Sequence, residues 1–405
     1  MKKNLAVIFG GKSTEHDISI ITANQLINTV DTKKYNVIPI YISNSGEWYS
    51  GQKLFDLNFF AHFNKKQISQ VAVLPCSKML YKSKFNRFRK YEQIDCAIIS
   101  CHGKGGEDGS VQGLLELAGI PYQSSGILGS AIGLDKFVMK QIFKQNKIPV
   151  VDFFEISKFN YESNSHIVDN INLPVVVKPN SLGSSIGISV CKNADELESA
   201  LSLAFMFDDR VLIERFIENL KEVNVSVLGD KNKICVSETE EVTSTGFLSF
   251  DKKYLQNSQK TAQNASKLPK ITQNNSKNVS NKVTYNKTKN NIGMQNMGRI
   301  IPANITKSQS QKIKLLAEKI FKCTYSKGVV RIDFMIDQST GKIYANEINT
   351  IPGSFAFYLW KKSGINFTTL VDRLVAIAEN DDLQKAKLIS IFPSSVLKQN
   401  TFNNK

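Results

Sequence analysis

Two neighbouring segments, Val329–Ile336 and Lys342–Asn349, constrain the fold more than any other part of the sequence. In both segments apolar residues alternate with polar ones, which is the pattern of a β-strand with one buried face. The residues between them, Gln338–Gly341, are of the kinds that form tight turns, so we expect the two strands to pair as a hairpin. The chain should therefore contain a sheet with one buried and one polar face in this region.

The polar positions of these two strands are in phase. Arg331 and Asp333 are two positions apart, as are Glu347 and Asn349, so the members of each pair share a face. If the strands pair in register, one face presents two carboxylates, an amide and a guanidinium. Oxygen ligands without His or Cys suit Mg²⁺ or Mn²⁺, which share phosphate oxygens with a nucleotide. A half-exposed hairpin is the alternative, but the common phase of the oxygen ligands favours a metal site.

A glycine- and serine-rich stretch, residues 179–187, lies between two predicted strands, Val175–Lys178 and Ile188–Val190. Its backbone N–H groups can bind phosphate oxygens, and Lys178 can add a positive charge. A Walker A loop leads into a helix rather than into a strand, so this stretch would be a strand–loop–strand phosphate clamp. As a pattern alone it is explained equally well by an ordinary hairpin loop.

The first 120 residues alternate predicted strands and helices, which indicates a parallel sheet with helices on both faces. Strand Leu5–Phe9 precedes a helix that we expect Ser13 or Thr14 to cap. Glu15 would then lie at the carboxyl edge of the sheet, where ligands bind in such folds, although an acid in the first turn also stabilises a helix dipole. The glycine-rich stretch His102–Gly109 is likewise either a ligand loop or a set of turns.

The net charge of +16 comes mostly from one segment. The chain has 52 Lys and Arg against 36 Asp and Glu, but residues 252–299 hold ten of the basic residues and no acidic one, which leaves 42 against 36 elsewhere. The segment is rich in Asn, Gln, Ser and Thr and cannot bury a core. Because it also lacks interleaved aromatic residues for base stacking, we expect a solvated insertion and no specific nucleic-acid partner.

Cysteine usage and hydropathy indicate a cytoplasmic protein. The six cysteines form no Cys-x-x-Cys pair, which favours reduced thiols over a disulfide scaffold or a structural zinc site. No apolar run approaches the ~20 residues that a membrane helix requires. The short apolar run at the N-terminus ends in Gly10–Gly11 without a cleavage site, so we expect a buried strand there and no signal peptide.

Taken together and in this order, the motifs resemble those of the D-alanine–D-alanine ligases of the ATP-grasp superfamily. The resemblance covers about residues 4–380, interrupted by the basic segment. It rests on the following stretches: Gly10–Glu15, His102–Gly109, Leu134–Lys136, Lys178–Ser185, Phe247–Tyr254, Arg331–Asp333 and Glu347–Gly353.

This resemblance implies an α/β fold: an ATP-grasp fold whose C-terminal part is α+β, preceded by a Rossmann-like domain. The implied parts are an N-terminal substrate-side domain (1–121), a central ATP-grasp subdomain (122–216), a C-terminal subdomain (217–385) with the basic insertion at about 256–295, and a polar tail (386–405). The residue pattern itself predicts one helix around Ser130–Gln145 in the central subdomain.

The implied activity is ATP-dependent ligation of two D-alanines through D-alanyl phosphate, for peptidoglycan precursor synthesis, with ATP and two Mg²⁺ or Mn²⁺. The implied metal ligands are Asp333, Glu347 and Asn349. The residues implied to bind ATP are Lys136, Lys178, Gly183, Ser184 and Ser185 at the phosphates, Glu214 and Ile217 at the adenine, and Glu222 at the ribose. The residues implied to bind or act on substrates are Glu15, His102, Ser184, Lys253, Tyr254, Arg331, Gly353, Ser354 and Tyr358.

Two features depart from the family pattern. The family has a Ser nine positions after the Asn ligand, where it receives the product carboxylate; here Tyr358 stands at that position, and its hydroxyl or that of Ser354 would substitute. The basic insertion begins directly after Tyr254, inside the loop that covers the substrates.

Two other readings stay open at this point. One is an ATP-grasp ligase that uses D-lactate or D-serine as second substrate. The other is a catalytically silent relative that binds polyanions through the basic insertion. The expected partners are small-molecule substrates, and the resemblance also allows a homodimer.

Overall fold

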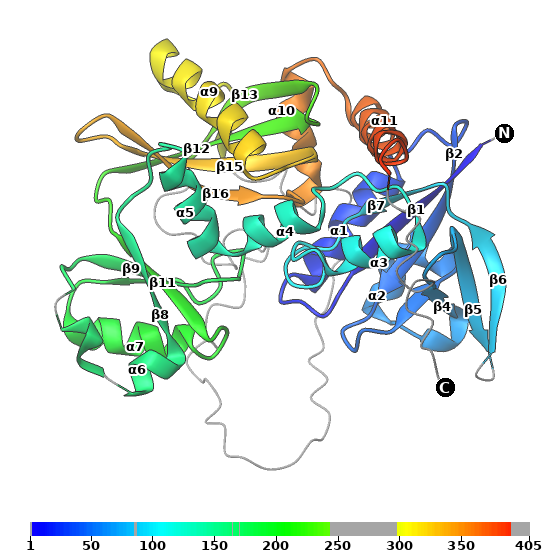
Figure 1. Ribbon diagram of the computed structural model, residues 1–405, viewed down its shortest axis with the longest axis horizontal. Helices are drawn as coiled ribbons and strands as arrows, with labels where there is room; N and C mark the ends of the chain where they lie inside the picture. Colours follow the sequence, from blue (N-terminus) through cyan, green and yellow to red (C-terminus); the bar gives the residue numbers. More distant parts are fainter. Residues whose placement is uncertain (1, 85–86, 164, 170, 244–297, 390–405) are drawn as a thin grey trace, which may run out of the picture.

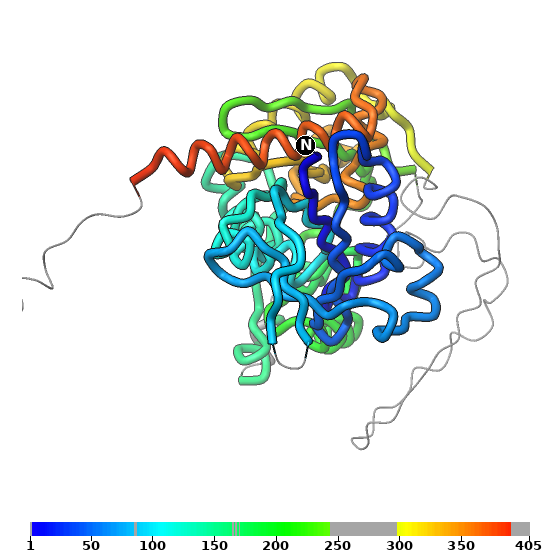
Figure 2. The backbone as a smooth tube through the Cα atoms, turned by 90° about the vertical axis from the view of Figure 1, so that its right-hand side faces the viewer, coloured from blue at the N-terminus to red at the C-terminus, as the bar shows by residue number. Residues whose placement is uncertain are grey.

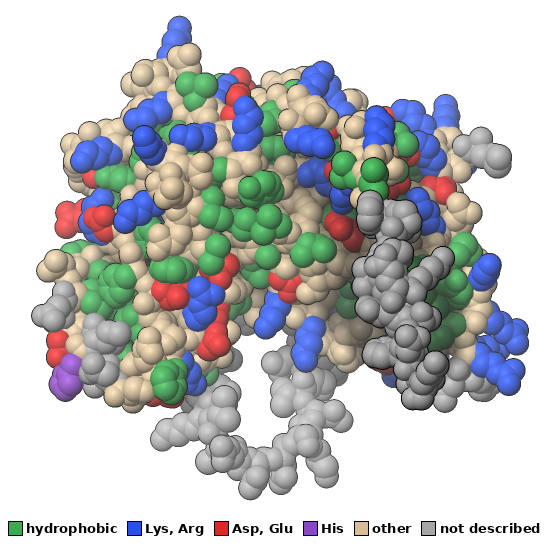
Figure 3. Space-filling model, viewed as in Figure 1, with side chains coloured by type: hydrophobic (Ala, Val, Ile, Leu, Met, Phe, Trp, Pro, Cys, Tyr) green, Lys and Arg blue, Asp and Glu red, His purple; other side chains and the backbone are tan. Residues whose placement is uncertain are grey.

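The computed structural model describes residues 2–84, 87–163, 165–169, 171–243 and 298–389, which form three sheets with their covering helices (Figure 1). The predicted insertion at 256–295, the predicted site residues Lys253 and Tyr254, and nearly all of the predicted tail lie outside the described residues. None of the described helices is long and apolar enough to cross a membrane. On the face shown in Figure 3, basic side chains are spread out rather than gathered in one patch.

The N-terminal sheet has seven strands in the order β6-β5-β4-β3-β2-β1-β7. Its three parallel strands are β1 (Lys3–Gly10), β2 (Tyr35–Ile42) and β7 (Cys96–Ile99). The strands that pair antiparallel are β3 (Trp48–Ser50), β4 (Ser69–Val73), β5 (Met79–Lys84) and β6 (Arg87–Gln93). The prediction of a parallel sheet is therefore right for the centre and wrong for the outer half. The β2–β3, β4–β5 and β5–β6 connections are too short for a parallel crossover, whereas β3 and β4 pair antiparallel across a longer connection.

Helices cover this sheet and bring Glu15 to its carboxyl edge. Helix α1 (His16–Ile27) follows β1, and its N-cap is Glu15, not Ser13 or Thr14 as predicted; the Ser13 hydroxyl instead accepts a hydrogen bond from the Glu15 N–H at 3.1 Å. Helix α3 (Ser110–Ala118) ends at a glycine with φ of 72°, in the left-handed region that suits a helix C-cap. The shorter helices of this part are η1 (Gln52–Phe55), α2 (Leu57–Ala61) and η2 (Lys65–Gln67).

The last described helix, α11 (Phe367–Lys385), belongs to the N-terminal core although it comes from the other end of the chain. Its Leu370 and Leu374 are fully buried in the same apolar cluster as Leu5 and Ile8 of β1. Its Asp372 also accepts a hydrogen bond from the Tyr35 hydroxyl at 3.0 Å. Figure 2 shows α11 passing the N-terminal strand and extending beyond the body of the molecule.

The second sheet has four strands in the order β10-β9-β11-β8 and carries the glycine- and serine-rich loop between β9 and β10. Its strands are β8 (Phe153–Ser157), β9 (Val175–Pro179), β10 (Ser189–Cys191) and β11 (Arg210–Arg215). Helix α7 (Ala194–Ala204) covers it, with Leu197 and Leu201 buried against Val177. The other helices here are α6 (Lys158–Ser163) and η3 (Ser165–Val168).

The third sheet has five strands in the order β14-β13-β12-β15-β16. Its strands are β12 (Leu220–Gly229), β13 (Ile234–Val242), β14 (Arg299–Ile300), β15 (Gly328–Asp337) and β16 (Lys342–Asn349). The predicted hairpin is confirmed: β15 and β16 pair antiparallel, with Arg331 opposite Asn349 and Asp333 opposite Glu347. Helix α9 (Lys307–Cys323) covers the apolar face, and η5 (Gly353–Ala356) and α10 (Phe357–Lys362) follow β16.

The predicted single helix around Ser130–Gln145 is two helices, α4 (Ile127–Leu134) and α5 (Lys136–Gln145). Asp135 separates them because its backbone is extended and its carboxylate accepts the N–H of Val138, which caps α5. Both helices contribute to the core of the third sheet, for example through Phe143. The apolar packing of this part thus crosses the predicted border at residue 216; the domain bounds themselves stay a prediction.

Candidate active site

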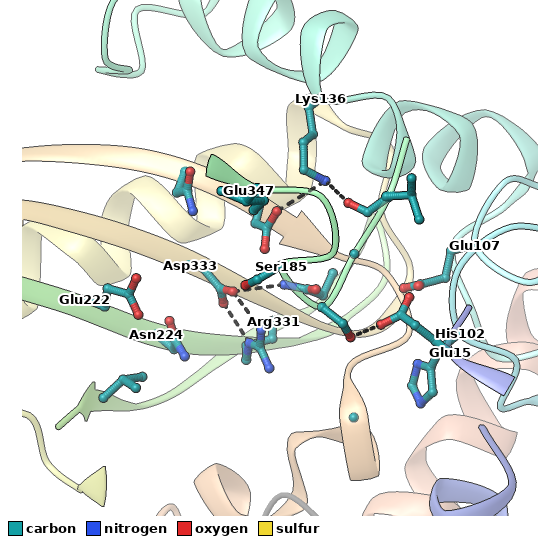
Figure 4. A pocket seen from close by; sticks show the side chains of 18 of the residues that line it. Glu15, His102, Glu107, Lys136, Ser185, Glu222, Asn224, Arg331, Asp333 and Glu347 are labelled. Atoms are coloured by element: carbon teal, nitrogen blue, oxygen red, sulfur yellow. Dashed lines mark hydrogen bonds and ion pairs between the residues drawn. The ribbon is translucent and has the colours of Figure 1, made fainter. Parts of the chain in front are cut away.

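A pocket lies where the three sheets meet, and most of the predicted site residues line it (Figure 4). The predicted residues in its lining are Glu15, His102, Lys136, Lys178, Gly183, Ser184, Ser185, Glu222, Arg331, Asp333, Glu347, Asn349 and Gly353. They come from positions between 15 and 353, so folding gathers residues that the sequence shows only as separate motifs.

The floor of the pocket is a row of polar side chains across the third sheet. Glu240 on β13 pairs with Asn224 on β12, Asn224 with Asp333 on β15, and Asp333 with Glu347 on β16. Residues directly opposite each other on antiparallel strands point to the same face. The row therefore runs four strands wide, of which the hairpin pattern predicts only the last two positions.

Asp333 and Glu347 are each held by a cation. The Asp333 carboxylate accepts two hydrogen bonds of 2.7 Å from the Arg331 guanidinium and one of 3.2 Å from the Asn349 amide. Burial lowers the pKa of Arg331, but the adjacent Asp333 carboxylate raises it by a larger amount, so the pKa of Arg331 lies above its ordinary value. Glu347 lies 3.4 Å from the ammonium of Lys136.

The donor set here fits a hard cation. It offers two carboxylates and an amide oxygen, and in the described part of the chain no three His, Cys, Asp or Glu residues gather to form a fuller metal site. Mg²⁺ is commonly bound by one or two carboxylates plus phosphate and water oxygens. The chemistry of Asp333, Glu347 and Asn349 thus suits Mg²⁺ held together with a nucleotide.

Two lysines face this row from the side of the second sheet. The Lys136 ammonium donates to the carbonyl of Leu182 at 2.6 Å, at the start of the glycine- and serine-rich loop. The Lys178 ammonium donates to the buried Glu214 at 2.7 Å and to the amide oxygen of Asn346 at 3.3 Å. The lysines and the carboxylate row thus enclose a space suited to a polyphosphate and its cation.

The loop after Lys178 turns sharply over the pocket. Ser184 and Ser185 both have left-handed backbones, with φ of 54° and 59°. Such conformations in non-glycine residues are strained and concentrate at ligand sites. The Ser184 hydroxyl donates to the Glu15 carboxylate, and a Cβ on Gly183 would lie 2.9 Å from a Glu15 oxygen. Only glycine lets the loop approach Glu15 this closely, so the second sheet meets the N-terminal domain at this point.

A second carboxylate, Glu107, lies beside Glu15. Its oxygens accept the N–H groups of Gly103 at 2.8 Å and Ile351 at 3.0 Å, which ties the N-terminal domain to the end of β16. Burial and the charge of Glu15 raise the pKa of Glu107 to about 8. Burial likewise lowers the pKa of His102 to about 4, so its imidazole is neutral at neutral pH.

Some predicted site residues lie elsewhere. Among the described residues, Glu214, Ile217, Ser354 and Tyr358 are outside the pocket lining. Ile217 is buried against Met335, which does line the pocket, whereas Glu214 is 2% exposed and forms ion pairs with Lys178 and Lys140. Its contact with the nucleotide would therefore run through Lys178.

The two hydroxyls predicted to receive the product carboxylate are both engaged within the protein. The Ser354 hydroxyl donates to the Gln25 side chain at 2.6 Å and points toward α1. The Tyr358 hydroxyl donates to Glu240 at 3.3 Å. Their predicted roles remain untested by these contacts, but both hydroxyls already have a protein acceptor.

Sequence reasoning missed several residues of the site. Glu107 stood within the quoted motif His102–Gly109, whose Glu between glycines was a usable signal. Glu240 and Arg299 also line the pocket. Arg299 is the last residue of the basic segment 252–299 and was counted with it, whereas Glu240 precedes the segment and belongs to no quoted motif. Lys140, 1% exposed, pairs with Glu214 at 2.9 Å; its signal was a lysine among buried positions of a helix.

A pocket enclosed by sheets, in which Lys178 of β9 and Lys136 of α5 face a row of carboxylates on the third sheet, is typical of an ATP-grasp enzyme. Comparison with known proteins specifies the class further. The family model "D-ala D-ala ligase N-terminus" matches residues 4–125, and "D-ala D-ala ligase C-terminus" matches residues 142–300 and 275–376. The chain belongs to the D-alanine–D-alanine ligase family.

Individual relatives agree with this assignment. The chain is 38% identical to a D-alanine–D-alanine ligase of Thermosipho melanesiensis over 394 residues, covering 96% of both chains, and 36% identical to that of Caldicellulosiruptor bescii, covering 96% and 98%. Among solved structures it resembles a D-alanine-D-alanine ligase from Coxiella burnetii (TM-score 0.75, 26% identity, 96% and 97% covered). It also resembles the VanG D-Ala:D-Ser ligase of Enterococcus faecalis (TM-score 0.72, 29% identity, 93% and 100% covered). The predictions of family, ATP-grasp fold and enzymatic activity are confirmed.

Proposed function

We propose that this pocket joins two D-alanine molecules at the expense of ATP, through a D-alanyl phosphate intermediate, as the family name implies. The observation that carries the proposal is one continuous lining in which Glu15 and Ser184 lie at one end and Lys136, Lys178 and the Asp333 row at the other. An amino-acid site and a polyphosphate site thus share one pocket. Such a shared pocket is what direct phosphoryl transfer to an amino acid requires.

In this proposal Lys136 and Lys178 bind the phosphates of ATP, and Asp333, Glu347 and Asn349 hold two Mg²⁺. Bound Mg²⁺ would neutralise phosphate charge and polarise the transferring group. The proposal draws support from the Lys136 ammonium, which lies 3.4 Å from Glu347. A phosphate bound here would contact the Lys136 cation directly, and the Mg²⁺ that neutralises the phosphate would be held by the Glu347 carboxylate. Met335 and Ile217 form an apolar surface suited to the adenine, and Glu222 is the nearby acid assigned to the ribose.

The first substrate would be fixed by its ammonium group at Glu15. Its carboxylate oxygen then attacks the γ-phosphorus, and ADP leaves, which gives the acylphosphate. Support comes from the Ser184 hydroxyl, which donates to Glu15 and so orients that carboxylate. The His102 imidazole lines the same pocket and is hydrogen-bonded through its Nε2 to the Thr22 hydroxyl at 3.0 Å. Because it is neutral, it adds no charge that would compete with the substrate ammonium for Glu15.

In the second step the amine of the second D-alanine, once it has lost a proton, attacks the acyl carbonyl, and phosphate leaves as the peptide bond forms. Arg331 and the N–H of Gly353 are the groups assigned to the oxyanion of the tetrahedral intermediate. Arg331 is suited to this because Asp333 fixes its guanidinium by two hydrogen bonds. Lys253 and Tyr254, assigned to the covering loop, lie outside the described residues.

A phosphate-release assay with ATP, Mg²⁺ and single candidate substrates tests the proposal. D-alanine should release phosphate and L-alanine should not, because Glu15 fixes the ammonium on one side of the carboxylate. Equal rates with the two enantiomers would refute the assignment. A preference for D-lactate or D-serine as second substrate would instead favour the alternative ligase activity; the VanG structure is an example of a D-Ala:D-Ser ligase.

We further propose that the enzyme works in the cytoplasm on small-molecule substrates and supplies peptidoglycan precursors. Free cysteines support a reducing compartment, since none of the six is paired in a disulfide. Size-exclusion chromatography with light scattering would test the homodimer that the resemblance allows.

A further inference from the structure

A cluster of ionic and aromatic side chains forms the pocket wall on the side of β13 and β14, next to Arg331. Arg299 on β14 lies 3.1 Å from Glu240 on β13, and the Arg299 guanidinium stacks 4.0 Å from the centre of the Tyr358 ring. Glu240 also accepts hydrogen bonds from Tyr358 at 3.3 Å and from Asn224 at 3.4 Å. The Arg299 and Glu240 side chains are 9% and 2% exposed. Contacts from β13 and α10 thus hold the Arg299 side chain in one orientation.

The other cations of the pocket face the phosphate and metal side. In the described lining these cations are Lys136, Lys178 and Arg331, whose partners are Glu347, Glu214 and Asp333. Arg299 is the cation on the side of β13 and β14. Nearby Glu240 and Asp333 make this wall unfavourable for a second anion unless a cation receives it.

The second amino acid brings such an anion into the pocket. Its amine reacts, whereas its carboxylate stays charged throughout and must be bound. A guanidinium has five N–H donors in a planar fork that matches a carboxylate bidentately, so one arginine can bind two carboxylates at once. The ring of Tyr358 and the charge of Glu240 orient the Arg299 fork before any substrate arrives, which lowers the entropic cost of binding.

We propose that Arg299 binds the carboxylate of the second substrate and of the dipeptide product, with Glu240 and Tyr358 as its positioning residues. The proposal rests on the proposed function, because it assumes a second substrate that carries a carboxylate. It assigns to Arg299 the role that the sequence reserved for the hydroxyl of Ser354 or Tyr358, both of which already donate to protein acceptors.

Two acceptors of the D-alanyl group, D-alanine and hydroxylamine, test this assignment, because only D-alanine carries a carboxylate. Hydroxylamine attacks the carbonyl of D-alanyl phosphate and displaces phosphate, so D-alanyl hydroxamate forms without an acceptor carboxylate. In Arg299→Gln, the KM for D-alanine as acceptor should rise about tenfold or more, the weight of a lost hydrogen bond to a charged group. Hydroxamate formation and the KM for ATP should stay within about twofold of wild type, since neither uses this contact.

Further variants make the test specific. Arg299→Lys keeps the charge but not the fork and should give an intermediate acceptor KM. Arg373→Gln removes an exposed arginine on α11 and should leave all three quantities unchanged. If Arg299→Gln folds poorly because Glu240 loses its partner, the double variant Arg299→Gln/Glu240→Gln removes both buried charges and should show the same acceptor defect.

Three results would overturn the proposal. An unchanged acceptor KM in Arg299→Gln would show that the carboxylate binds elsewhere. An equal loss of hydroxamate formation would show a general defect of the site. An increase in Tyr358→Phe as large as that in Arg299→Gln would assign the carboxylate to the Tyr358 hydroxyl. A wild-type enzyme that forms no hydroxamate at all would instead refute the proposed function itself.

Discussion

Lys140 provides the sharpest test of how Lys178, the lysine proposed to bind phosphate, is held in place. Its ammonium lies 2.9 Å from one oxygen of Glu214, whose other oxygen lies 2.7 Å from Lys178. The side chains of Lys140 and Glu214 are 1% and 2% exposed, so water screens neither charge. Burial raises the pKa of Glu214, but the two lysines lower it more, to about 2. Lys140→Met keeps the length of the side chain and removes one of these two cations.

The structure sets the size of the expected effect. Removing one partner of a buried ion pair costs about 3–5 kcal/mol. Because Glu214 keeps Lys178, we expect the lower end of that range, about 3 kcal/mol. At an unfolding entropy of about 2.1 cal/mol/K per residue, a chain of this length loses about 1 °C per kcal/mol, so the melting temperature should fall by about 3–4 °C. The KM for ATP should rise as well, since Glu214 then attracts Lys178 alone.

Differential scanning calorimetry and phosphate-release kinetics measure the two effects. The matched control is Lys3→Met, which removes an ion pair of 2.5 Å with Glu379 whose side chains are 51% and 33% exposed. Such exposed pairs contribute about 0–1 kcal/mol, so its melting temperature should fall by no more than about 1 °C. If Lys140→Met and Lys3→Met melt at the same temperature, the reasoning about buried charge at Glu214 is wrong.

Three further predictions concern the site and the insertion. Glu347→Gln should abolish turnover in a folded protein, because an amide is a poor substitute for a carboxylate metal ligand; near-normal phosphate release at saturating Mg²⁺ would remove Glu347 from the metal site. Deleting residues 256–295 with a short Gly/Ser linker, while keeping Lys253 and Tyr254, should preserve the melting temperature and ligase activity, since the segment brings few groups that can join a core; loss of ligation in a well-folded deletion would show that it belongs to the covering loop. Glu107 has a pKa raised from 4.5 to about 8, so the folded state holds its proton more tightly than the unfolded state, and its contribution to stability should be lost as pH rises from about 5 to about 8. Glu107→Gln should flatten that part of the stability profile, and an unchanged slope would assign the pH dependence to other groups.

The local part of the site followed directly from the sequence. The site's polar residues on the hairpin form two pairs, Arg331 with Asp333 and Glu347 with Asn349. The members of each pair lie two positions apart in a strand, and a short turn connects the two strands, so the period of a β-strand places all four on one face. Their register in the structure agrees with that expectation. Motif order then supplied the family and the fold.

The rest depended on pairing between distant strands. Nothing local indicates that Glu240 and Asn224 extend the same row, because the register of β12 with β13 and β15 is set by the packing of the whole sheet. The helix cap was missed because Ser13, Thr14 and Glu15 are adjacent and the sequence does not fix which of them starts the helix; in the structure Glu15 is the N-cap and makes no side-chain cap hydrogen bond. The substrate role of Tyr358 stays a prediction, but its sequence position did not indicate that its hydroxyl donates to Glu240.

The position of α11 in the N-terminal core has a consequence for synthesis on the ribosome. The seven-stranded sheet is complete in sequence at β7, yet Leu370 and Leu374, which help to bury it, are translated about 270 residues later. At about 5–20 residues per second, the nascent chain carries this sheet without its last helix for roughly 15–55 s. The first domain to emerge therefore cannot finish folding until the ribosome has synthesised α11, at residues Phe367–Lys385.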